Sequence, residues 1–147
     1  MTDSFPPPLA ALLEEFADIP DWDERYGYII DLGRRLPPID KAVQIEANRV
    51  HGCMSTVWLV ARTVGTGEQH LEIIADSDSL IVKGLIVILL SLFSGLTPAK
   101  ALTIDVESVF AQFGLAQHLS PNRRNGLYSM VQRIRTLAAH ELATNVH

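Results

Sequence analysis

The sequence predicts an α+β fold in which a small antiparallel β-meander packs against helices. Two runs of β-forming residues, 56–63 and 70–75, are separated by a short turn that contains two glycines. The run 80–94 is apolar nearly all round, which is typical of a buried central helix. A sheet this small needs helices on one face. With 147 residues, 48% of them apolar, the chain is expected to form a single domain, 1–147, around one core.

The first part of the chain predicts two helices. Residues 1–8 are expected to form a flexible lead-in, because three consecutive prolines remove backbone donors and disfavour helix. Apolar residues in 9–16 recur at positions i, i+3, i+4 and i+7, which predicts an amphipathic helix. Asp21 is placed to cap a second helix, with Glu24 three residues later, and Pro37 ends it soon after Arg35.

The middle of the chain is expected to carry the sheet and the buried helix. Residues 39–48 alternate imperfectly and are interpreted as a loop that leads into a short strand at 48–51. Asp76 and Asp78 stand just before residue 80, and we interpret them first as caps of the buried helix. Gly95 is expected to follow the end of that helix.

The C-terminal part predicts helices only. Two short ones are expected at 98–102 and 106–113, the second stopped by Gly114. Ser120 and Pro121 then supply a cap and a first-turn proline for a last helix that reaches about residue 142.

Composition excludes several classes of function. The net charge is −5 and no cluster of Lys and Arg exceeds a pair, which disfavours a nucleic acid partner. The most apolar stretch, 80–96, is short for a membrane span and contains Lys83, so no membrane partner is expected. The N-terminus lacks the features of a secretory signal. A single, unpaired cysteine suits a reducing compartment, and a cytoplasmic location is expected.

The stretch around that cysteine is the strongest candidate for a functional site. Residues 50–62 read V-H-G-C-M-S-T-V-W-L-V-A-R, so Cys53 follows a glycine and precedes a strand. Free cysteines are often buried and inert, but a thiol on a loop held by a rigid strand is also where reactive sulfur is presented. There is no C-x-x-C pair and no Cys/His set at metal spacing.

This stretch resembles the cysteine loop of the SufE family. Four further blocks match in the same order: Y-I-I-D-L-G-R-R-L-P at 28–37, A-D-S-D-S-L-I-V-K-G-L-I at 75–86, L-T-P at 96–98 and Q-H-L-S-P-N-R-R-N-G-L at 117–127. The resemblance implies a SufE/IscU-like fold and no cofactor of the chain's own. It also implies that the protein takes sulfur from a PLP-dependent cysteine desulfurase (SufS-like or CsdA-like) and holds it as a persulfide on Cys53. The protein would further stimulate that enzyme and pass the sulfur to an iron–sulfur scaffold.

In addition to Cys53, four residues are candidate partner contacts. Gly52 belongs to the cysteine block, and His51 is placed to act as a base or proton donor for the thiol. Asp76 is a partner contact if it is not a cap. Arg123 matches an arginine of the family's S/T-P-x-R block, which implies a part in steadying the thiolate or meeting the partner.

Three alternatives stay open. The first is a CsdE-type protein, which serves a different desulfurase and a different acceptor. The second is an allosteric activator of a desulfurase, in which Cys53 is only structural. The third is a papain-like cysteine hydrolase, for which His118 is the available histidine, although nothing in the sequence provides an oxyanion site.

Overall fold

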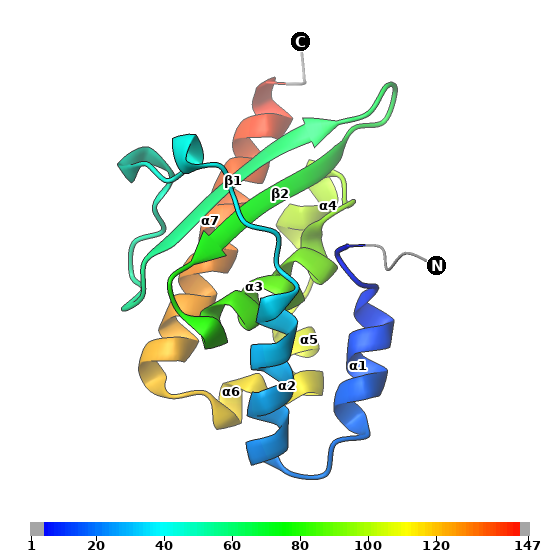
Figure 1. Ribbon diagram of the computed structural model, residues 1–147. Coiled ribbons are helices and arrows are strands. Elements are labelled where there is room, and N and C mark those ends of the chain that lie inside the picture. Colours follow the sequence, from blue (N-terminus) through cyan, green and yellow to red (C-terminus); the bar gives the residue numbers. More distant parts are fainter. Residues whose placement is uncertain (1–4, 145–147) are drawn as a thin grey trace.

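The computed structural model describes residues 5–144, and its architecture is α+β, as predicted (Figure 1). An antiparallel hairpin lies across one end of a group of helices. In chain order the elements are α1 (Leu9–Ala17), α2 (Trp22–Arg34), the 3-10 turns η1 (Lys41–Val43) and η2 (Glu46–Asn48), β1 (Val57–Val64), β2 (His70–Ser77), α3 (Leu80–Phe93), α4 (Pro98–Thr103), α5 (Val106–Phe113), α6 (Leu115–His118) and α7 (Pro121–Thr144).

The hairpin buries one face and leaves the other partly exposed. β1 and β2 pair antiparallel in a register that sets Val57 opposite Ser77 and Val64 opposite His70. Alternate residues of each strand are buried, including Leu59 and Leu71, because successive side chains point to opposite faces. The long helix α7 packs against β1, and α3 packs against β2 (Figure 1). The buried face of this two-stranded sheet therefore packs on α3 and α7.

Helix α3 is the centre of the core. Most of its side chains are buried, as the apolar sequence predicts. Its backbone meets that of α2 at two glycines: a Cβ on Gly84 would lie 2.0 Å from the carbonyl oxygen of Ile29, and one on Gly33 would lie 2.8 Å from the backbone nitrogen of Gly84. The two helices can approach this closely only because neither residue has a side chain.

The segment before β1 departs from the prediction. The short strand expected at 48–51 is wrong: the chain forms η2 there, and only an isolated bridge joins Arg49 to Trp58. The reason is local, because polar residues of this segment make short-range bonds, such as that from the Asn48 side chain to the carbonyl oxygen of Val43 at 2.9 Å. The helix α6 was also not predicted.

The caps of α3 differ as well. Ser79, not Asp76 or Asp78, caps this helix, since its side chain accepts a hydrogen bond from the backbone N–H of Val82. Of the expected lead-in, residues 1–4 lie outside the described residues, and Phe5 packs partly buried against the core. Within residues 5–144, no helix is long and apolar enough to cross a membrane.

Candidate functional site

Cys53 lies on a loop, residues 51–56, whose two ends are held by hydrogen bonds. At its base, the backbone N–H of Val50 donates to the carbonyl oxygen of Val57 at 2.9 Å. At its C-terminal end, the N–H of Thr56 donates to a carboxylate oxygen of Asp78 at 3.1 Å, and the Ser77 hydroxyl donates to the Thr56 carbonyl at 2.7 Å. The start of β1 and the end of β2 therefore hold both ends of this loop, which we call the Cys53 loop.

Two glycines let the tip of the Cys53 loop lie directly on α7. Gly52 has a φ of +93°, which favours glycine, and a Cβ there would lie 2.5 Å from the hydroxyl of Ser129. The thiol of Cys53 donates a long hydrogen bond to the carbonyl oxygen of Gly126 at 3.6 Å. A Cβ on Gly126 would lie 3.4 Å from the Cys53 sulfur. The thiol thus lies in a notch on α7, which exists because Gly126 has no side chain.

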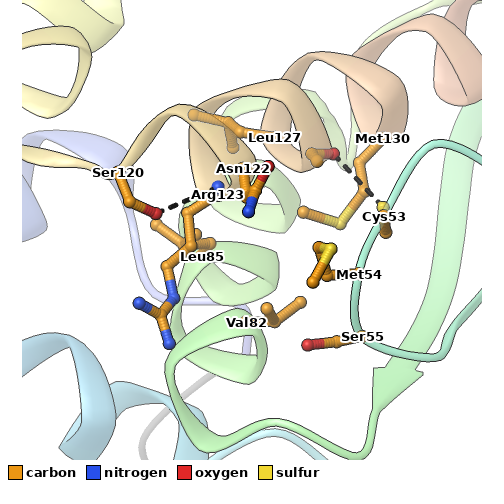
Figure 2. Close-up of a pocket in the computed structure, with 11 residues that line it drawn as sticks. Cys53, Met54, Ser55, Val82, Leu85, Ser120, Asn122, Arg123, Leu127 and Met130 are labelled. Atoms are coloured by element: carbon orange, nitrogen blue, oxygen red, sulfur yellow. Dashed lines mark hydrogen bonds between the residues drawn. The ribbon is translucent and has the colours of Figure 1, made fainter.

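A cavity of about 200 Å³ adjoins the thiol, between α7, the start of α3 and the Cys53 loop (Figure 2). Its inner wall is apolar and its outer part is polar. The lining residues are Cys53, Met54, Ser55, Val82, Leu85, Ser120, Asn122, Arg123, Gly126, Leu127 and Met130. Three of them, Leu85, Leu127 and Met130, are each 1% exposed, whereas Met54 is 82% exposed at the edge. The cavity can therefore shelter a small apolar group attached to the thiol.

The electrostatics at rest favour the protonated thiol. Burial raises the pKa of Cys53, because an apolar environment disfavours the anion. Arg123 is the cation of the cavity: it is exposed, and its backbone N–H donates to the capping Ser120 hydroxyl at 3.3 Å. Among the described residues its guanidinium has no carboxylate partner within ion-pair distance. Figure 2 shows this guanidinium directed away from Cys53, so its positive charge lies at the outer edge of the cavity.

The structure brings together only some of the sequence-predicted residues. Cys53 and Arg123 line one cavity, and Gly52 shapes the loop. His51 does not line the cavity; its ring lies 3.1 Å from the carboxylate of Glu46 and its side chain is 74% exposed. Asp76 is buried away from the cavity, where it accepts the backbone N–H of Ser77 and pairs with Lys83 at 3.5 Å.

Several lining residues were missed by sequence reasoning. Gly126 stands inside the block at 117–127, but its closeness to Cys53 depends on how α7 packs on the loop. Met54 is adjacent to Cys53 in sequence, whereas Met130 gave no signal beyond an apolar helix position. Val82 and Leu85 were expected as core, and their second role as a cavity wall follows only from tertiary packing.

Comparison with known proteins shows the family of this chain. Residues 10–138 match the model of the family described as "SufE: Fe-S metabolism associated domain". An uncharacterised SufE-like protein of Rhizobium meliloti is 39% identical over 135 residues, covering 91% of this chain and 96% of its own length. A second, from Rhizobium etli, is 40% identical over 128 residues, covering 86% of each. The chain therefore belongs to the SufE family.

A solved structure shares the fold. The solution structure of a hypothetical protein from Thermus thermophilus superposes with a TM-score of 0.70 at 23% identity, covering 92% of this chain and 96% of that one. In the described part of the chain, no group of three or more His, Cys, Asp or Glu side chains is placed to hold a metal ion.

The raised pKa predicts how the reactivity of Cys53 depends on pH. We expect alkylation of the folded protein by iodoacetamide to rise with a midpoint above the usual cysteine value of about 8.5, and the midpoint to fall back in denaturant. Because the folded pKa is raised, the stabilisation from keeping the thiol protonated is present below the unfolded pKa and is lost as pH rises through the folded pKa. A folded midpoint below that of the unfolded chain would contradict this account of the site.

Gly126→Val is predicted to unseat the thiol. A Cβ at this position would already lie 3.4 Å from the Cys53 sulfur, an ordinary van der Waals contact, so the two further methyl groups of valine leave too little room for the thiol. We therefore expect the loop tip to shift outward and alkylation to be several times faster than in the wild type. Gly27→Val is the matched control, because nothing lies within 4 Å of a Cβ at that helical position. Circular dichroism checks that both variants stay folded, and equal alkylation rates in the two would show that the notch does not restrain the thiol.

Proposed function

We propose that this protein is a sulfur acceptor and carrier that takes persulfide sulfur from a PLP-dependent cysteine desulfurase onto Cys53, stimulates the desulfurase and passes the sulfur to iron–sulfur cluster assembly. One observation carries the proposal: a partly buried thiol lies at the wall of a mainly apolar cavity, on a loop whose two ends are held by hydrogen bonds and whose tip makes one long bond to α7. Membership of the SufE family supports the desulfurase as the partner. A SufS-like and a CsdA-like enzyme are both compatible with this chemistry.

The transfer is a thiol exchange that conserves atoms and electrons. The Cys53 thiolate attacks the outer sulfur of the desulfurase persulfide, a new S–S bond forms, and the old S–S bond breaks. The desulfurase thiolate leaves with the bonding electron pair and takes up the proton that Cys53 gave up. The cavity keeps solvent reductants from the Cys53 persulfide, and Arg123 adds a positive charge at the outer edge of the cavity. These steps suit a reducing compartment such as the cytoplasm.

The seated thiol is poorly reactive, so the proposal requires the loop to move when the desulfurase docks. The thiol–Gly126 contact is long and weak, whereas the loop ends are held by backbone bonds, so the tip is the part that turns outward. We expect amide hydrogen exchange in residues 50–56 to change on complex formation, while the paired strands β1 and β2 stay protected. Unchanged exchange in residues 50–56 within a proven complex would argue against this opening.

A labelling experiment tests acceptance itself. The desulfurase is incubated with this protein and with cysteine that is radiolabelled on its sulfur atom. The proteins are then separated by electrophoresis without reductant. We expect label on this chain, removed by dithiothreitol, and none when the desulfurase is omitted. Label that stays on the desulfurase alone would refute the carrier function.

The hydrolase alternative gains no support from the site. His118 does not line the cavity; its ring stacks on Trp22 at 4.2 Å, and its backbone carbonyl accepts a hydrogen bond from Tyr26. A nucleophile of that class needs an imidazole within hydrogen-bond reach of the sulfur. The described structure therefore favours sulfur exchange over hydrolysis.

A further inference from the structure

The cavity beside Cys53 is larger than one sulfur atom requires. Its volume of about 200 Å³ equals that of a sphere about 7 Å across, and about 15 Å³ of such space is enough for one water. A persulfide extends the side chain by one S–S bond of about 2.05 Å. A singly loaded Cys53 therefore leaves most of the cavity unfilled by sulfur.

The residues that line the inner cavity favour additional sulfur atoms over water. A buried water needs two or more polar partners, yet the inner wall is formed by Val82, Leu85, Leu127 and Met130, each at most 8% exposed. Divalent sulfur is apolar and polarisable, and it packs well in such surroundings. Met54 and Met130 add thioether sulfurs to the lining (Figure 2). The inner cavity therefore accepts neutral chain sulfur.

The outer part of the cavity suits the charged end of a longer chain. Only the last atom of a polysulfide bears the negative charge, so lengthening the chain moves that charge away from the half-buried Cys53 sulfur. Ser120 and Asn122 provide a hydroxyl and an amide among the lining residues, and Arg123 adds a positive charge at the outer edge. A hydrogen-bond donor or cation at that end favours the anion, whereas burial at Cys53 opposes it.

We propose that Cys53 holds two transferable sulfur atoms, as Cys53–S–S–S⁻, within this cavity. The inference rests on the proposed function, because the donor is the same desulfurase persulfide. In the second round the terminal sulfur of the Cys53 persulfide attacks the outer sulfur of a newly formed desulfurase persulfide. The new S–S bond forms, the desulfurase S–S bond breaks, and the released desulfurase thiolate takes the proton of its former persulfide. No other oxidant or reductant is needed.

Intact-mass analysis without reductant measures the load directly. Wild-type protein incubated with excess desulfurase and cysteine is expected to show species heavier by one and by two sulfur atoms, both reversed by dithiothreitol and both absent from Cys53→Ser. Val82→Phe fills the cavity from its α3 wall. It should lower the ratio of doubly to singly loaded protein by about tenfold, which corresponds to a loss of about 1.4 kcal/mol in the free energy of holding the second sulfur. Val82→Leu should lower it less, and serves if the larger side chain prevents folding.

Val64→Phe is the matched control, because Val64 is 38% exposed and lines a different cavity; its ratio should equal that of the wild type. Wild-type protein that carries one sulfur and never two would overturn the inference and leave the carrier function standing. So would a ratio that is unchanged in the Val82 variants. Protein that carries no sulfur at all would overturn the proposed function as well.

Discussion

Cys53→Ser is expected to abolish sulfur acceptance, with no detectable persulfide on the protein after incubation with desulfurase and cysteine. Serine is close in size to cysteine and its hydroxyl can still donate to the Gly126 carbonyl, so the loop should keep its seat on α7. Only the nucleophilic sulfur is lost. Binding to the desulfurase, measured by calorimetry, should therefore remain within a fewfold of the wild type.

The same variant separates the carrier from an allosteric activator. If Cys53 carries sulfur, Cys53→Ser should also lose stimulation of the desulfurase, because the enzyme persulfide is no longer removed by the protein. Stimulation that survives in the variant would contradict the carrier account and support an activator in which Cys53 is structural. Turnover is measured as alanine released from cysteine, with wild-type protein as the positive control.

Gly84→Ala is expected to produce the largest loss of stability. The new Cβ would lie 2.0 Å from the carbonyl oxygen of Ile29, which is backbone and cannot rotate away, so α2 and α3 must separate. Overpacking of a core usually costs about 1–3 kcal/mol, and this contact belongs at or above the upper end. Urea unfolding followed by circular dichroism should show the transition midpoint fall sharply, or the variant should not fold.

Gly27→Ala on α2 provides the control. It adds the same methyl group to a helical glycine with open space around it, and alanine is the better helix former. Its stability should match or slightly exceed that of the wild type. Equal stability of Gly84→Ala and Gly27→Ala would show that the α2–α3 contact is looser than described.

The fold was largely predictable because its signals are local. The hairpin turn, the apolar run of α3 and the Ser120 and Pro121 start of α7 each follow from propensity and spacing, and each is observed. The expected strand at 48–51 failed because side chains there bond to nearby backbone, which alternation of apolar residues does not reveal.

Only part of the cavity lining was predicted from the sequence. Cys53 was singled out as the one thiol of the chain, ahead of a strand, and Arg123 from the resemblance at 117–127; both line the cavity. Its seat on Gly126 and the wall supplied by Val82 depend on contacts between segments far apart in the sequence, and no local pattern encodes them. Asp76 looked like a cap from its position, yet the ion pair with Lys83 gives it a structural part instead.

The central claim is that sulfur from the desulfurase arrives on Cys53. The most direct measurement traps the reaction mixture with iodoacetamide, digests the protein and weighs the peptide that contains Cys53. We predict an alkylated peptide heavier by sulfur at Cys53 than the alkylated thiol, formed only with both desulfurase and cysteine and lost when dithiothreitol precedes trapping. An unloaded Cys53 peptide after many turnovers of a bound desulfurase would contradict the claim.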